Sequence, residues 1–252
     1  MRVLLSNDDG VHAAGLAALA AAFADDEVWI VAPDREQSAS SHSISLHRPL
    51  RISEMGPRRF AVDGTPTDAV YLALNHLMKG QRPDVVVSGV NHGPNLGNDV
   101  LYSGTVAAAM EGALLGVHAL AISLAAPPPH VFEHAAAFAA ALARRVVANP
   151  PPAPALLNVN VPAGPVKGYR FARLGHRTYG SDVVEKLDPR GRKYFWIGSE
   201  ADFLDVPHSD CNTVLDDGLV AVTPLHLDLT HDGVLTGLRN WTLDGYRKEP
   251  AL

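Results

Sequence analysis

Short apolar runs alternate with stretches of helical spacing through most of the chain, and this alternation limits the folds that it can adopt. Runs of strand length fall at residues 2–6, 27–32, 59–62, 84–88, 117–124 and 156–161. Between them, apolar residues recur at helical intervals over residues 15–24, 65–77, 105–115 and 131–148. Strands that are separated by helices pair in parallel, with helices packed on both faces of the sheet. The pattern therefore predicts a three-layer α/β fold with a mostly parallel sheet.

The character of the sequence changes after Pro162. Residues 150–154 (PPPAP) form the clearest internal boundary, and we expect a core over residues 1–164 and a β-rich extension over residues 165–252. A turn at residues 188–191 (DPRG) indicates antiparallel strands, and a returning strand at 219–223 and a helix over 233–241 follow. Residues 165–207 are interpreted either as an arm for subunit contact or as a lobe over the site.

Charge and cysteine content exclude several classes of function. The formal net charge is −6 and no long basic run is present, which argues against binding to a nucleic-acid polymer. A single cysteine, Cys211, rules out an internal disulfide and a CxxC metal site. Neither a signal-peptide pattern nor an apolar run of membrane-spanning length occurs, so we expect a cytoplasmic protein without a membrane partner.

Polar side chains follow three of the predicted strands at the point where each strand ends. Asp8 and Asp9 come after the first strand, Ser38 lies in the loop after the second, and Asn91 follows the run at 84–88. Because ligands bind at the carboxyl ends of parallel strands, we expect these side chains to meet. Oxygen donors of this kind suit Mg²⁺, Mn²⁺ or Ca²⁺ rather than zinc. The plainer interpretation of residues 7–10 (NDDG) is a loop with a helix cap.

Ser103, Gly104 and Thr105 open the helix predicted to reach residue 115. A helix N-terminus offers free backbone N–H groups to an anion, and Gly104 lets the anion approach closely. Taken alone, Ser103 is better explained as an N-cap. Beside a metal loop on the same sheet edge, an anion site indicates a phosphate-ester hydrolase.

Other patterns carry less weight. The spacing of Gly10 and Gly15 matches the outer glycines of a P-loop, but the required Lys-Ser/Thr pair is missing. No GxGxxG follows the first strand, which disfavours a dehydrogenase, and no DxD pair supports a phospho-aspartate. His42 and His92 lie in the loops of the expected site and are able to transfer protons, but each is better explained as a polar loop residue than as a catalyst.

The chain resembles the survival protein E (SurE) family of stationary-phase nucleotidases in a series of motifs that runs almost from end to end. The matching segments are residues 4–10 (LLSNDDG), 31–38 (VAPDREQS), 64–68 (GTPTD), 87–97 (VSGVNHGPNLG), 102–112 (YSGTVAAAMEG), 158–162 (NVNVP), 188–191 (DPRG), 194–198 (YFWIG) and 221–225 (AVTPL). Departures fall at Ser40 and Ser41 and over residues 206–212.

This resemblance implies a divalent-metal phosphatase with a Rossmann-like core, of the 5′-nucleotidase class, which hydrolyses nucleoside monophosphates and as a further option short polyphosphate. It places the metal on Asp8, Asp9, Ser38 and Asn91, and the substrate phosphate beside Asn95 and residues 103–105. It also implies a C-terminal arm that swaps between the subunits of a homodimer or homotetramer.

In the expected mechanism, the cation neutralises charge that grows during P–O cleavage and water attacks in line. Asp8 or Asp9 accepts the proton of that water, and the sequence does not distinguish between them. The alternative function is a Rossmann-like module that senses a nucleotide without hydrolysing it. Base preference, 5′ or 3′ position and the physiological metal are not readable from the sequence.

Overall fold

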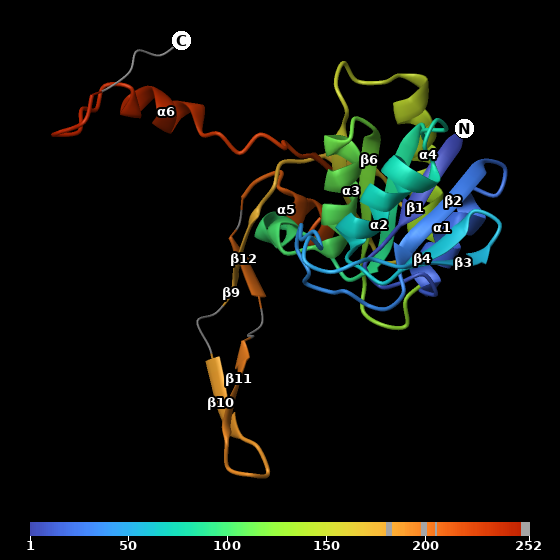
Figure 1. Ribbon diagram of the computed structural model, residues 1–252, viewed down its shortest axis with the longest axis horizontal. Helices are drawn as coiled ribbons and strands as arrows, with labels where there is room; N and C mark the ends of the chain where they lie inside the picture. The colour runs from blue at the N-terminus through green and yellow to red at the C-terminus, as the bar shows by residue number, and fades with distance from the viewer. Residues whose placement is uncertain (180–182, 198–200, 205, 248–252) are drawn as a thin grey trace.

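A nine-stranded sheet forms the centre of the molecule, in the order β3-β4-β2-β1-β5-β6-β7-β13-β8 (Figure 1). The computed structural model describes residues 1–179, 183–197, 201–204 and 206–247. Neighbouring strands pair in parallel except β3 with β4 and β13 with β7. The strands are β1 (Arg2–Ser6), β2 (Glu27–Pro33), β3 (Ile52–Gly56), β4 (Arg59–Val62), β5 (Val85–His92), β6 (His118–Ala125), β7 (Leu156–Pro162), β8 (Tyr169–Phe171) and β13 (Val220–Pro224).

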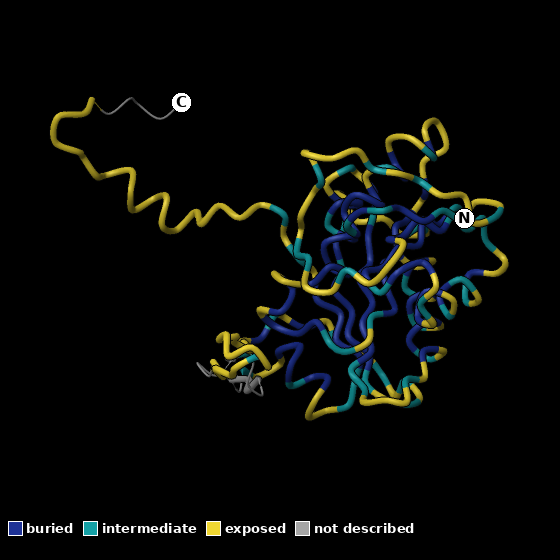
Figure 2. The backbone as a smooth tube through the Cα atoms, turned by 60° about the horizontal axis from the view of Figure 1, so that its bottom comes forward, coloured by how far each residue is buried: buried dark blue, intermediate teal, exposed yellow. Residues whose placement is uncertain are grey.

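Helices cover both faces of this sheet, which confirms the predicted α/β architecture. Helices α1 (Ala14–Ala22) and α4 (Glu133–Ala148) pack on the face that presents Val3 and Leu5. On the opposite face, α2 (Pro66–Leu72), the π-helical turn η1 (Ala73–Leu77) and α3 (Gly104–Leu114) pack against Leu4 and its neighbours. Successive residues of β1 thus enter different cores because side chains alternate along a strand. Figure 2 shows the buried residues gathered in the central body.

A capping box fixes the start of α2. The Thr65 hydroxyl accepts a hydrogen bond from the Asp68 backbone N–H, and the Asp68 carboxylate accepts one from the Thr65 N–H. Pro66 occupies the first turn, where its missing N–H costs nothing. These contacts lie within four residues, so local sequence was sufficient to predict them.

Four elements were not predicted. Strand β3 has a charged, non-alternating sequence, so periodicity gave no signal for it, although its partner β4 follows at once in the chain. Helix α5 (Asp210–Leu215) is a single short segment rich in poor helix formers. Strands β9 (His176–Tyr179) and β12 (Ala201–Leu204) pair with each other rather than with the main sheet, and hydrophobic periodicity does not report such a pairing.

The C-terminal part extends away from the body at two places (Figure 1). Strands β10 (Val183–Leu187) and β11 (Lys193–Ile197) form an antiparallel hairpin around the predicted turn at 188–191, and α6 (Asp232–Leu238) lies on a separate outward segment. Strands β8 and β13 lie beyond residue 164 but join the main sheet. The division into domains at residue 164 stays a prediction.

Over the residues that the structure describes, no helix is both long enough and apolar enough to cross a bilayer. The cytoplasmic location stays a prediction from the sequence.

A glycine lets α1 approach the sheet closely. A Cβ atom built on Gly15 lies 2.1 Å from the backbone oxygen of Val90, which is shorter than any van der Waals contact. Val90 follows β5 residues Val85 and Val87, which pack in the same core as Leu16 and Leu19. The helix therefore reaches its buried position only because position 15 has no side chain.

We expect Gly15→Ala to lower the free energy of unfolding by about 1–3 kcal/mol, since the helix or the Val90 peptide must move. Urea denaturation followed by circular dichroism measures this change. Gly237→Ala is the matched control, because Gly237 also lies in a helix and its added Cβ meets nothing within 4 Å. Equal stability of the two variants would contradict the packing argument.

Candidate metal and phosphate site

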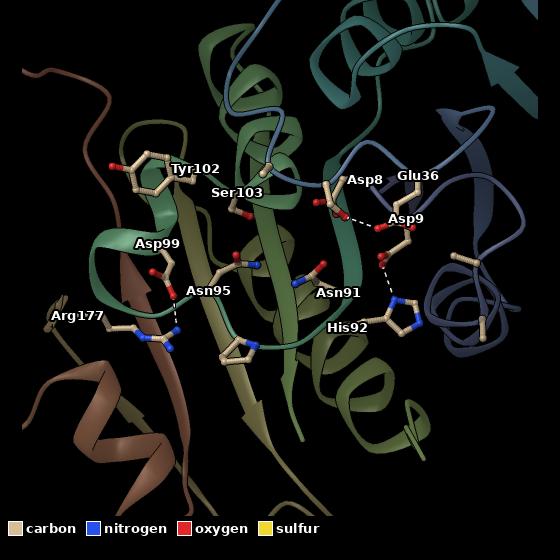
Figure 3. A pocket seen from close by; sticks show the side chains of 15 residues that line it. Asp8, Asp9, Glu36, Asn91, His92, Asn95, Asp99, Tyr102, Ser103 and Arg177 are labelled. Carbon is tan, nitrogen blue, oxygen red and sulfur yellow. Dashed lines mark hydrogen bonds and ion pairs between the residues drawn. The ribbon is translucent and has the colours of Figure 1, made fainter. Parts of the chain in front are cut away.

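A cavity of about 670 Å³ opens at the carboxyl ends of β1 and β5, beside the start of α3 (Figure 3). This is the edge of an open parallel sheet at which ligands bind. The cavity brings together six of the predicted site residues from four separate segments. They are Asp8, Asp9, Ser38, Asn91, Asn95 and Ser103.

Asp8 is the most deeply placed carboxylate of the cavity, with 5% of its surface exposed. Its pKa is raised to about 6, chiefly by burial; a hydrogen bond from Thr105 acts against this rise, and the neighbouring Asp9 charge adds to it. The Thr105 hydroxyl donates that bond to Asp8 Oδ1. A negative charge at Asp8 is therefore poorly stabilised by the protein itself.

Asp9 lies on the other side of the loop and contacts a histidine. Its Oδ2 lies 2.9 Å from His92 Nδ1, as the dashed line in Figure 3 shows. The His92 ring packs edge-on against His130 and Phe132, with centroid separations of 5.2 and 5.0 Å. The aromatic contacts hold the imidazole in place, so it restrains one oxygen of the Asp9 carboxylate.

Ser38 and Asn91 each donate a hydrogen bond to a neighbouring group of the protein, which leaves their oxygen atoms as acceptors. The Ser38 hydroxyl donates its proton to Glu36 Oε1 at 2.7 Å, which leaves the oxygen as an acceptor. Asn91 Nδ2 donates to the backbone oxygen of Gly93 at 2.9 Å, which leaves the Asn91 carbonyl oxygen. Both side chains therefore present an uncharged oxygen to the cavity.

These donors form a set that fits a hard divalent cation. Within the described ranges, no three residues among His, Cys, Asp and Glu are grouped so that they could hold a metal ion. A metal here must combine the two aspartates with the neutral oxygens of Ser38 and Asn91. Two carboxylates with neutral oxygens suit Mg²⁺ or Mn²⁺, and the raised pKa of buried Asp8 is the cost that a cation removes.

The start of α3 lies against Asp8. Ser103 is its N-cap, and the Ser103 hydroxyl accepts a hydrogen bond from the Val106 N–H at 3.1 Å. A Cβ atom on Gly104 would lie 2.7 Å from Asp8 Cβ, so only glycine allows this approach. Thr105 is fully buried and does not line the cavity. Its predicted contact with phosphate stays a prediction, and in the structure its hydroxyl binds Asp8.

Sequence reasoning missed Glu36, Asp99, Tyr102 and Arg177, which also line the cavity. Arg177 of β9 pairs with Asp99 across 78 positions of the chain (Figure 3). Glu36 and Asp99 stand in loops that the sequence marks as polar, but no signal connects Arg177 to them. His42 lies outside the cavity lining, and its Nε2 is 3.0 Å from Glu111 Oε2.

Comparison with known proteins shows the family to which the chain belongs. Residues 3–181 match the family described as "Survival protein SurE". A protein of an Anaeromyxobacter species named "5'-nucleotidase SurE" is 78% identical, with 100% of each chain covered. A Myxococcus xanthus protein of the same name is 56% identical, with 99% of this chain and 97% of the relative covered. The crystal structure of the Aquifex aeolicus SurE protein superposes with a TM-score of 0.84 at 36% identity, covering 95% of this chain and 98% of that one. The chain belongs to the SurE family.

Proposed function

We propose that this chain is a divalent-metal-dependent phosphatase that hydrolyses nucleoside monophosphates to nucleoside and phosphate. The observation that carries the proposal is the pair of aspartates, Asp8 and Asp9, at the floor of a cavity lined by neutral oxygen donors. The name "5'-nucleotidase" of the relatives supports the choice of substrate. We also propose short polyphosphate as a further substrate, because cleavage of its phosphoanhydride bond likewise needs water to attack a phosphorus atom.

Asp8, Asp9, Ser38 and Asn91 are the residues that would hold one Mg²⁺ or Mn²⁺ ion, with Ca²⁺ as another option. When bound, such an ion supplies positive charge for the phosphoryl group and makes water more acidic. Asp8 and Asp9 are the carboxylates available to accept the proton of the attacking water. Thr105 and His92 each restrain one of these carboxylates and so keep the other oxygens in the cavity.

The phosphate of the substrate is assigned to Asn95, Ser103 and Gly104. The first turn of α3 carries partial positive charge from its backbone N–H groups, although the Val106 N–H is already bonded to the Ser103 hydroxyl. The close packing of Gly104 on Asp8 brings this helix end beside the aspartates. A phosphate held there would have its negative charge compensated by the helix end and by the bound cation.

We also propose that the C-terminal region joins copies of this chain into a homodimer or homotetramer, as a swapped arm. The hairpin β10–β11 exposes Phe195, Trp196 and Ile197 at 56%, 62% and 91% of their surface. A lone two-stranded hairpin is marginally stable, and contiguous exposed apolar side chains mark contact surfaces. The outward segment with α6 exposes Trp241 and Tyr246 in the same way.

We expect phosphate release from nucleoside monophosphates with Mg²⁺ or Mn²⁺, and loss of that activity with a chelator. A colorimetric phosphate assay over a panel of nucleotides and polyphosphate measures both. Asp8→Asn should lower kcat/KM by a factor of about 10² or more, because a charged metal ligand is lost. Asp25→Asn, at an exposed position, serves as the matched control. A nucleotide sensor, in contrast, would be stabilised by the ligand without any turnover.

The burial of Asp8 predicts a pH-dependent stability without metal. Its folded pKa of about 6 exceeds the ordinary 3.8, so the folded state binds more protons between these values. The free energy of unfolding should therefore fall as pH rises from about 4 to about 6. Asp8→Asn should lack this loss and gain up to about 3 kcal/mol on the wild type by pH 7.

Urea denaturation in the presence of a chelator, at pH values on both sides of this window, measures the difference between the two proteins. The same pH dependence for Asp8→Asn and wild type would show that the Asp8 carboxyl is not the titrating group. Addition of Mn²⁺ at pH 7 should stabilise the wild type more than the variant.

We expect Trp196→Asp to shift the protein toward smaller species, since a charge in an apolar contact costs desolvation. Sedimentation velocity over a range of concentrations measures the assembly. Arg190→Asp, in the exposed turn of the same hairpin, is the control and should keep the wild-type distribution. A wild type that stays monomeric at all concentrations would reject the oligomer proposal.

A further inference from the structure

Asn95 is held by three buried polar side chains from the neighbouring strands. Asn160 Oδ1 accepts the Asn95 backbone N–H at 2.8 Å, and Asn160 Nδ2 donates to the Asn95 backbone oxygen at 3.0 Å. Asn158 Nδ2 donates to the same oxygen at 2.8 Å. Asn95 Nδ2 donates to the Ser123 hydroxyl at 2.7 Å. We call Ser123 of β6 and Asn158 and Asn160 of β7 the Asn95 clamp.

Burial of the polar side chains of the clamp costs free energy. All three side chains are fully buried, on strands whose other residues, such as Ile122 and Val159, form apolar core. Buried amides and hydroxyls cost free energy unless they are bonded, and a fold needs none of them at these positions. The Asn158 Oδ1 atom is buried with no hydrogen-bond partner among the described residues, which adds to the cost.

The bonds of the clamp converge on one residue of the cavity. Asn160 pairs with both backbone polar groups of Asn95, so it restrains the peptide on each side. Ser123 takes one N–H of the Asn95 side-chain amide, which restrains the rotation of that amide. The second amide N–H and the carbonyl oxygen stay available, and Asn95 is 7% exposed where it lines the cavity (Figure 3).

We propose that Ser123 and Asn160 are positioning residues for phosphate recognition, which act by fixing the side-chain amide of Asn95 toward the substrate phosphate. This inference rests on the proposed function, because it assigns a phosphate to that part of the cavity. A donor held in place before the phosphate arrives loses little freedom on binding and needs no reorganisation during reaction. Loss of a clamp residue therefore weakens phosphate recognition without touching the metal ligands.

Ser123→Ala is the primary variant, since it removes one oxygen and leaves the shape of the side chain nearly unchanged. Ser88→Ala is the matched control: Ser88 is equally buried on β5, and its hydroxyl has no hydrogen-bond partner among the described residues. Titration of the Mn²⁺-loaded full chain with inorganic phosphate gives the phosphate affinity. Separate Mn²⁺ titration gives the metal affinity, and kcat and KM are measured with a nucleoside 5′-monophosphate.

We expect Ser123→Ala to weaken phosphate binding and lower kcat/KM by about 3- to 10-fold, the effect of one neutral hydrogen bond. Mn²⁺ affinity should not change, and Ser88→Ala should match the wild type in every measurement. In an Asn95→Ala background, Ser123→Ala should have no further effect, because both act through the same amide. Asn160→Ala should follow the same pattern, after urea denaturation has shown that it is folded under the assay conditions.

Equal phosphate affinity of Ser123→Ala and Ser88→Ala would overturn the clamp, as would full additivity with Asn95→Ala. A matching loss of Mn²⁺ affinity would also overturn it, because the site would then be loosened as a whole. If the wild-type protein is active, any of these results rejects the clamp but not the proposed function. A wild type that neither binds phosphate nor releases it from nucleotides overturns the proposed function together with the clamp.

Discussion

The arrangement of the cavity depends on the two carboxylates at the end of β1. Asp8 is buried beside Asp9, and the protein supplies a hydroxyl, Thr105, where it could have supplied a full positive charge. Burial of a carboxylate on these terms raises its pKa to about 6 and costs stability at neutral pH. A fold retains such a cost where the charge serves a bound cation, and the oxygen donors around it have the chemistry of that role.

Close approach of backbone elements makes the charged cavity possible. Gly104 lets the start of α3 reach Asp8, and Gly15 lets α1 lie on the backbone at Val90. Two helices on opposite faces of the sheet are thus drawn toward the same edge. The N-terminal end of the α3 dipole then lies beside the cavity, where its positive potential favours negative charge.

Polar side chains reach the cavity both from the central strands of the sheet and from the C-terminal extension. The Asn95 clamp rises from β6 and β7, where every neighbouring position contributes to the apolar core. Arg177 comes from β9 at the base of the extension and pairs with Asp99. Arg177 lines the cavity and also belongs to the C-terminal extension, which exposes apolar side chains and is proposed to contact another copy of the chain.

Much of the architecture and part of the site followed from local sequence. The order of strands and helices, the capping box of α2 and the hairpin turn depend on contacts within a few residues, which periodicity and turn chemistry report. Asp8, Asp9, Ser38 and Asn91 were found because loops after parallel strands share one edge. Helix α5 and the β9–β12 pair were missed because their stability comes from distant partners. Strand β3 was missed because its charged sequence does not alternate, although its partner β4 is adjacent in the chain.

Only the tertiary structure decided which of these groups contact one another. It turned the Thr105 hydroxyl to Asp8, brought Arg177 to Asp99, and joined β8 and β13 to the sheet. The sequence by itself determined which chemical groups stand at the strand ends and which segments form the layers. Which of those groups meet depends on packing between residues that are far apart in the chain. Neither local spacing nor composition reports such long-range contacts.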